Sequence, residues 1–282
     1  MPLLLLPAPV YGEGIDLTAI SDVHWDRGTL GITVKADIGD YRSPGEARVA
    51  FEDKLRREIG TIFCEALYDI YLDSYRTIKE ALERNNALLM ALLDLGNRVA
   101  PMNIYLDTTL STLTATFQFN MYPDIINIFT THTYPYAPTS LMYHVPTVKY
   151  SGIVIYAKGE YPVHGEDPAG KNPEPFHPSI QPKIFDTQMN LVAEAEMMEP
   201  EYLSRWGTFG YTDTTDYLAE KERIGATPIF TMARAVFGDY RTDLLIPVDV
   251  ADQILATPDN RKLIEQGRIL IICDLPAAPL ID

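Results

Sequence analysis

The sequence predicts an α+β protein of two domains, and three observations support that fold class. Strand-like alternation and helix-like periodicity interleave along the chain, with hairpin patterns as well. A stretch rich in Pro and aromatic residues, within 120–149, separates two well-patterned blocks. The length of 282 residues allows one large domain or two of ordinary size, and the 46% hydrophobic content is enough for a substantial core.

The N-terminal domain is expected at 13–130 and begins with a β-hairpin. Apolar residues alternate through 15–25, and the alternation resumes from 30 to 36 after a turn that contains Gly28. The segment Ser43-Pro44-Gly45-Glu46 then has the composition of a helix start: a capping Ser, a Pro in the first turn and a Glu three residues after the Ser. Apolar residues at helical spacing extend this first helix to about Tyr75.

The rest of the N-terminal domain is expected to form a second helix and a pair of strands. The second helical pattern covers 77–95 and is expected to end at Gly96-Asn97. Alternation at 104–106 and 113–119 then predicts two more strands. The N-terminal domain is therefore a layer of hairpin, helices and strands.

A connection at 131–149 leads into the C-terminal domain, expected at 150–276 as a mixed α/β sheet. A long loop rich in Pro and Gly interrupts it at 159–181. Strands are predicted at 150–158, 182–186, 188–194, 228–237 and 268–274. Helices are predicted at 200–206, 214–223, 247–256 and 260–266.

The charge balance disfavours two classes of partner. A net charge of −16 argues against nucleic acid and against docking through a polybasic patch on anionic lipid. No apolar run approaches the roughly 18–20 residues of a membrane-spanning helix. Residues 1–12 are either a signal remnant, with Val10-Tyr11-Gly12 as a small-x-small cleavage site, or an apolar tail. We expect an exported, periplasmic protein; the alternative is a cytoplasmic one.

The most enzyme-like string in the chain is Asp22-Val-His24. It resembles the first motif of metallophosphoesterases, in which Asp22 and His24 would bind one of two metal ions. The later motifs of that family are incomplete: Gly39-Asp40 lacks a second Asp, and Gly96-Asn97 lacks its His. We therefore favour the polar face of a hairpin and expect no metal or other cofactor.

Two further groups of residues can be interpreted in two ways. The group Arg205, Trp206, Phe209 and Tyr211 could form a recognition surface, although a core layer is the commoner use of such aromatics. Cys64 and Cys273 could pair in an exported protein, but their predicted helix and buried strand favour free thiols.

The order of segments in the second half carries a family resemblance. Tyr150–Gly159, Pro182–Asp186, Gly207–Tyr211, Arg223–Ile229 and Arg268–Ile272 resemble successive segments of flagellum-associated bacterial envelope proteins. These are the basal-disc lipoproteins of the FlgP type and the N-terminal region of FlgT. The resemblance lies mainly within 150–274, and it implies an envelope protein that assembles through packed domains. The long 159–181 insertion departs from the pattern, and no lipidation Cys is present near the start.

The function expected from these observations is non-enzymatic. We expect an exported envelope or flagellum-accessory structural protein that binds other protein subunits, either copies of itself or components of the motor. One alternative is a divergent metal-dependent phosphoesterase that uses Asp22 and His24. Another is a small-ligand or peptide-binding module that uses the aromatic group near Trp206 and the 159–181 loop.

Overall fold

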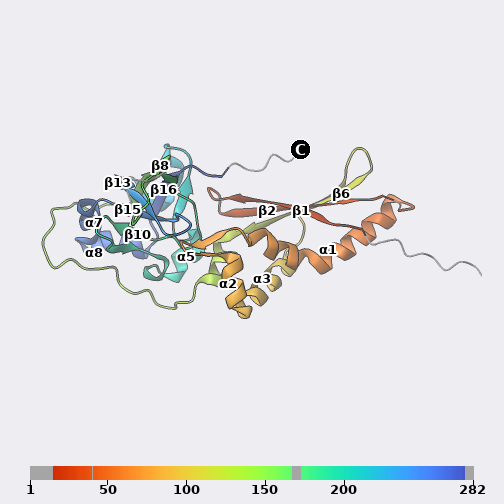
Figure 1. Cartoon of the computed structure of the whole chain (residues 1–282), viewed down its shortest axis with the longest axis horizontal. Helices are drawn as coiled ribbons and strands as arrows, with labels where there is room; N and C mark the ends of the chain where they lie inside the picture. Colours follow the sequence, from red (N-terminus) through yellow and green to blue (C-terminus); the bar gives the residue numbers. More distant parts are fainter. Residues whose placement is uncertain (1–14, 40, 167–172, 277–282) are drawn as a thin grey trace, which may run out of the picture.

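The computed structural model describes residues 15–39, 41–166 and 173–276, and it shows the α+β, two-domain architecture expected from the sequence (Figure 1). In the N-terminal domain, a four-stranded antiparallel sheet has the order β1-β2-β6-β5. Its strands are β1 (Thr18–His24), β2 (Thr29–Asp37), β5 (Asn103–Leu106) and β6 (Thr112–Asn120). The predicted hairpin and the later strand pair are both confirmed.

Helix α1 (Pro44–Leu67) packs on one face of this sheet and begins where the capping motif predicts. The Ser43 hydroxyl accepts a hydrogen bond from the backbone N–H of Glu46 at 3.2 Å. The prediction that the helix extends to Tyr75 is wrong, because the chain leaves α1 after Leu67 and forms a short hairpin. That hairpin consists of β3 (Tyr71–Asp73) and β4 (Arg76–Thr77).

The predicted second helix is two helices, α2 (Ile78–Arg84) and α3 (Asn86–Arg98). Asn85 separates them in an extended conformation, and its side chain accepts a hydrogen bond from the N–H of Ala87 at 3.0 Å. Gly96 does not end the helix as predicted. It lies where α3 packs closely against α1, because a Cβ atom at Gly96 would lie 2.9 Å from the Cα of Gly60.

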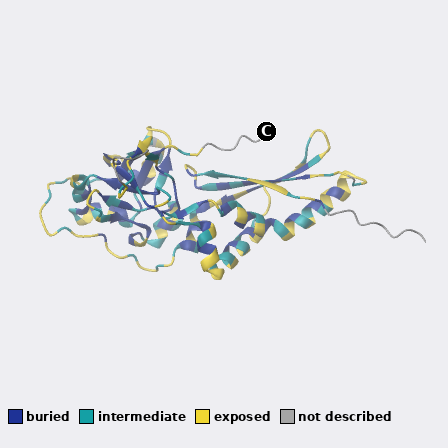
Figure 2. Ribbon diagram, in the orientation of Figure 1, coloured by how far each residue is buried: buried dark blue, intermediate teal, exposed yellow. Residues whose placement is uncertain are grey.

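The core of the N-terminal domain lies between the sheet and these helices (Figure 2). The alternation of β2 places Leu30, Ile32, Val34 and Ala36 in this core, while the residues between them are partly exposed. Phe63 of α1 stacks on Phe119 of β6, with ring centroids 4.2 Å apart. One face of the sheet is therefore covered by helices, as an antiparallel sheet allows.

The C-terminal domain contains two four-stranded sheets. The first is parallel and has the order β12-β16-β7-β13; it comprises β7 (Ile153–Ala157), β12 (Gly210–Thr212), β13 (Ile229–Met232) and β16 (Ile269–Cys273). The second is mixed and has the order β11-β10-β15-β14; it comprises β10 (Ile184–Asp186), β11 (Leu191–Ala193), β14 (Ala235–Phe237) and β15 (Asp243–Ile246). The predicted mixed α/β sheet domain is thus present.

Short helices connect the strands of this domain. They are α5 (Pro200–Trp206), α6 (Lys221–Ile224), α7 (Val248–Leu255) and α8 (Pro258–Glu265), with 3₁₀ turns at Ala195–Met197 and Tyr217–Glu220. The 159–181 loop carries a small hairpin of β8 (Glu160–Tyr161) and β9 (Glu174–Pro175). Arg241 holds this loop through ion pairs to Glu166 at 2.7 Å and to Glu174 at 2.9 Å.

Two hairpin tips of the N-terminal domain dock into the C-terminal domain. At the end of β1, Trp25 packs edge-on against Tyr211, with ring centroids 5.4 Å apart. At the β3–β4 tip, the buried Ser74 donates to the carbonyl of Phe237 at 3.1 Å and lies 2.9 Å from the hydroxyl of Thr242. The buried apolar core is correspondingly continuous across both domains.

The remaining connection begins with a π-helical turn (Met121–Ile125) and α4 (Ile126–Phe129). Residues 130–152 then form neither helix nor strand. This segment, which we call the strap, runs around the outside of the C-terminal domain past α7 and α8 (Figure 1).

Candidate functional site

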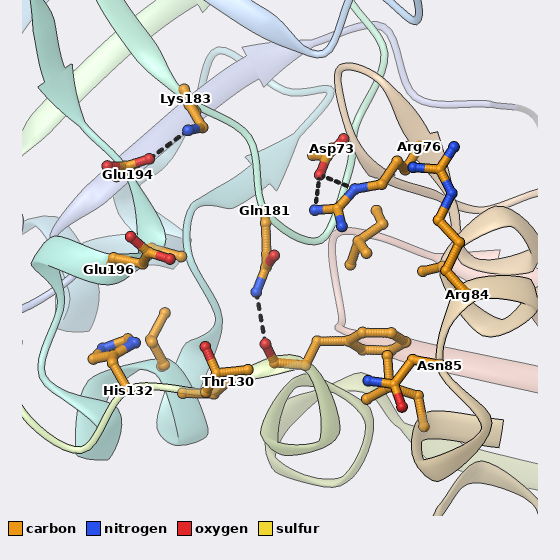
Figure 3. Close-up of a pocket in the computed structure, with 17 residues that line it drawn as sticks. Asp73, Arg76, Arg84, Asn85, Thr130, His132, Gln181, Lys183, Glu194 and Glu196 are labelled. Carbon is orange, nitrogen blue, oxygen red and sulfur yellow. Dashed lines mark hydrogen bonds and ion pairs between the residues drawn. The ribbon is translucent and has the colours of Figure 1, made fainter. Parts of the chain in front are cut away.

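A cavity of about 370 Å³ lies between the two domains (Figure 3). β3, β4, α2 and the start of α3 form its N-terminal wall. Residues 181–183 and the turn Ala195–Met197 contribute to the opposite wall, and the chain after α4 lines the side between them. Because both domains supply side chains, the cavity exists only while the domains stay docked.

The positions of its N-terminal side chains follow from local capping. Thr77 and Glu80 form a complete capping box at the start of α2. Asn85 then ends α2 and caps α3. Arg84 and Asn85 are therefore fixed at the corner between two helices, on the rim of the cavity.

Two ion pairs lie on opposite walls of the cavity. On the N-terminal side, Arg76 Nε lies 2.9 Å from Asp73 Oδ2. On the C-terminal side, Lys183 Nζ lies 2.6 Å from Glu194 Oε2, and the Tyr136 hydroxyl donates to the same carboxylate. Burial opposes the charge of Lys183, but the hydrogen bond and the negative charge of Glu194 outweigh it and raise the pKa of Lys183.

Gln181 spans the middle of the cavity. Its side-chain amide donates to the carbonyl of Phe129 at 3.0 Å (Figure 3), and its backbone N–H donates to the carbonyl of Leu72 at 2.7 Å. Gln181 thus joins the C-terminal domain to both the hairpin and the connection. The sequence could not predict that these residues meet, because they come from segments far apart in the chain.

Asp243 is a buried carboxylate close to this cavity. Its Oδ1 accepts from the backbone N–H of Lys183 at 2.8 Å, and it is only 2% exposed. Burial raises the pKa of Asp243 to about 7, against the opposing effects of the Lys183 N–H and the Ser74 hydroxyl.

Two of the four residues considered as a recognition surface lie in the core, which is the commoner use of such aromatics. Phe209 and Tyr211 are 1% and 2% exposed, because both side chains belong to the core. The Tyr211 hydroxyl donates to the carbonyl of Ser179 at 2.8 Å. Arg205 lies over the Trp206 ring, 4.5 Å from its centroid. Of the four, Arg205 and Trp206 remain accessible. They line a cleft of about 250 Å³, which Tyr211 also lines.

Arg223 is a buried charged residue, which the sequence indicated only as the start of a segment in the family resemblance. The guanidinium is buried at the base of the Trp206 cleft and donates to four backbone carbonyls. Nε donates to Gly267 at 2.8 Å, Nη1 to Trp206 at 2.8 Å, and Nη2 to Gly207 and Thr208 at 3.1 Å each. Burial lowers the pKa of Arg223 to about 10, so this side chain remains charged at neutral pH. Its contacts hold the 206–208 segment in place.

Asp22 and His24 lie next to each other on one face of β1. His24 Nε2 is 3.0 Å from Asp22 Oδ2, so each is the other's partner. Among residues 15–39, 41–166 and 173–276, no group of three or more His, Cys, Asp or Glu side chains could hold a metal ion. The donor set around Asp22 therefore does not fit the two-metal site of a phosphoesterase.

The two cysteines are separate and buried. Cys64 lies in α1 and Cys273 in β16, and both are free thiols. Burial raises the pKa of Cys64 to about 11 and raises that of Cys273 as well. The disulfide considered from the sequence is not formed.

Within the described part of the chain, no helix has the length and apolar character needed to cross a membrane. The predicted signal remnant or tail, residues 1–12, lies outside the described residues.

Comparison with known proteins finds two matches to family models. Residues 16–128 match the model of the N-terminal domain of Treponema pallidum Tp0624, and residues 152–275 match the model of its second domain. No curated protein matches the chain. The chain thus carries, in the same order, domains similar to the first two domains of Tp0624.

Proposed function

We propose that the protein is a non-enzymatic structural component of the cell envelope that binds other protein subunits through the strap. The observation that carries the proposal is the exposure of large apolar side chains along this segment. Met142 is 98% exposed, Tyr134 85%, and Tyr143 and Val148 about 60% each. Exposed apolar groups gathered on one segment are typical of protein-binding surfaces.

The strap is anchored at several points. The Tyr143 hydroxyl donates to Asp252 of α7 at 2.8 Å, and the Tyr150 hydroxyl donates to Gln253 at 2.8 Å. The side chain of Asn260, in α8, donates to the carbonyl of Val148 at 2.9 Å and accepts from the N–H of Tyr150 at 3.1 Å. A partner would therefore meet a surface that is already ordered, which lowers the entropy cost of binding.

The envelope location and the class of partner rest on the family resemblance of residues 150–274. That resemblance supports an exported, periplasmic protein whose partners are copies of itself or flagellar motor components. The proposal requires no cofactor and assigns no catalytic step.

Cell fractionation combined with co-purification tests this proposal. The tagged protein should appear in the envelope fraction and retain its partner subunits. The variant Tyr134→Ser/Met142→Ser should lose them, because both side chains lie at the proposed contact. The control is Val49→Ser, which removes an apolar side chain that is 62% exposed on α1, and it should retain them. A cytosolic protein, or equal retention by both variants, would contradict the proposal.

A further inference from the structure

The charges of the interdomain cavity are divided between its two walls. The N-terminal wall carries two guanidinium groups, Arg76 and Arg84, against one carboxylate, Asp73. The C-terminal wall carries two carboxylates, Glu194 and Glu196, against one ammonium group, Lys183. One wall therefore has a net charge of +1 and the other a net charge of −1.

The two ion pairs leave one charge on each wall for a ligand. Asp73 is paired with Arg76, and Glu194 with Lys183. Within the described residues no ion pair joins Arg84 or Glu196 to a group of opposite charge, although Glu80 influences Arg84 and Lys183 influences Glu196 electrostatically.

Figure 3 shows Arg84 and Glu196 on opposite sides of the cavity, with Gln181 between them. A ligand that reaches both residues must therefore carry its two charges at opposite ends.

The space between the charged ends is partly apolar and of ligand size. Leu72, Leu88, Phe129 and Leu203 line it. A volume of about 370 Å³ falls in the range of small-molecule sites. Free amino acids carry both charges on a single carbon, whereas a short peptide separates them and places small side chains between them.

We propose that this cavity binds a short peptide with free termini, its carboxylate toward Arg84 and Arg76 and its ammonium group toward Glu196 and Glu194. Charge-assisted hydrogen bonds fix the two ends. Gln181 offers its side-chain carbonyl to the peptide backbone. Thr130, Thr131 and His132 at the start of the strap line this cavity, but the exposed apolar side chains at 134–148 do not. The inference does not depend on the proposed function.

Calorimetric titration of the full chain with three matched probes tests the inference. The probes are trialanine, N-acetyl-trialanine, which lacks the ammonium group, and trialanine amide, which lacks the carboxylate. Trialanine should bind, and each capped form should bind at least about tenfold more weakly, since each loses one charge-assisted contact.

Two variants of the cavity test which residue binds each end of the peptide. Arg84→Met should weaken trialanine about tenfold and leave trialanine amide unchanged, because the amide has no carboxylate to lose. Glu196→Gln should weaken trialanine to a similar extent and leave N-acetyl-trialanine unchanged. Arg56→Met serves as the control, since Arg56 is a surface residue with a side chain that is 78% exposed. Thermal melts confirm that each variant is folded.

Two results would overturn the inference. One is the absence of trialanine binding at concentrations up to about 10 mM, where even a millimolar affinity would be detected. The other is equal affinity for all three probes, or affinities that Arg84→Met and Glu196→Gln leave unaltered.

Discussion

At the scale of single residues, buried charge is concentrated where the two domains and their loops meet. The Arg223 guanidinium donates to four backbone carbonyls, and Asp243 lies beside the docked tip of the β3–β4 hairpin. Removing the Arg223 side chain would leave several buried carbonyls without donors, each of which is costly. Both residues hold together the segments that meet around them.

Asp243 should make the stability of the protein depend on pH. Its folded-state pKa of about 7 lies above the ordinary Asp value of 3.8, so the folded state binds the proton more tightly than the unfolded state. The contribution of Asp243 to the free energy of unfolding is fully present below about pH 4. As pH rises from there to about 7, the contribution is lost at roughly 1.4 kcal/mol per pH unit.

Asp243→Asn should remove this slope between pH 5 and about 7, as measured by urea unfolding at several pH values. Asp213→Asn provides a matched control at an exposed carboxylate. A slope that Asp243→Asn leaves unchanged would contradict the assignment.

At the scale of elements, close approaches determine how the segments pack. The Tyr122 ring lies between two glycines: a Cβ atom at Gly28 would be 2.5 Å from it, and one at Gly207 would be 2.1 Å from it. Gly207 also has a φ of 72° and a ψ of −178°, a conformation that is nearly exclusive to glycine. The contact between Gly207 and the Tyr122 ring therefore fixes the end of α5 against the connection between the domains.

Gly207→Ala should destabilise the protein by more than about 3 kcal/mol, because backbone strain and the clash with Tyr122 add together. Gly159→Ala isolates the first contribution, since Gly159 has a φ of 83° and nothing within 4 Å of its Cβ position. It should cost only about 1 kcal/mol. Equal losses in chemical denaturation would show that the contact with Tyr122 has no energetic weight.

The sequence predicts elements well where the pattern is local. The β1–β2 hairpin, the capped start of α1 and the buried strand β16 all follow from periodicity and capping. The strands β12 and β15 were missed because β12 is short and begins with a glycine, and because β15 begins with the buried Asp243. The break at Asn85 was missed because apolar spacing continues across it.

The candidate cavity could not be predicted from the sequence. Arg84, Gln181 and Glu196 come from three separate segments, and only the docking of the two domains brings them together. The aromatic group divides between two environments. Phe209 and Tyr211 are close to Trp206 in sequence, but packing places them in the core, the commoner use of such residues.

At the scale of the whole molecule, two docked hairpin tips join the domains. Trp25 and Ser74 enter the C-terminal domain at separate points, and the apolar core is continuous between the domains. The charge pattern of the cavity and the position of the strap both depend on this arrangement.

The intact protein should therefore unfold in a single cooperative transition. Trp25→Ala/Ser74→Ala should separate the transition into two, because it removes the buried ring and the buried hydroxyl that join the domains. Calorimetry measures the number of transitions, and Tyr105→Ala, at an exposed position of β5, is the control. Two transitions in the unaltered protein would show that the docked tips do not couple the unfolding of the domains.

The central claim is that the strap is the surface at which other subunits bind. Photo-crosslinking in intact cells tests it most directly, with a benzophenone amino acid at Met142 and, as the control, at Val49. The account predicts discrete envelope-protein adducts, or dimers of this chain, from position 142 and none from position 49. Equal labelling at the two positions, or no adduct from position 142, would contradict it.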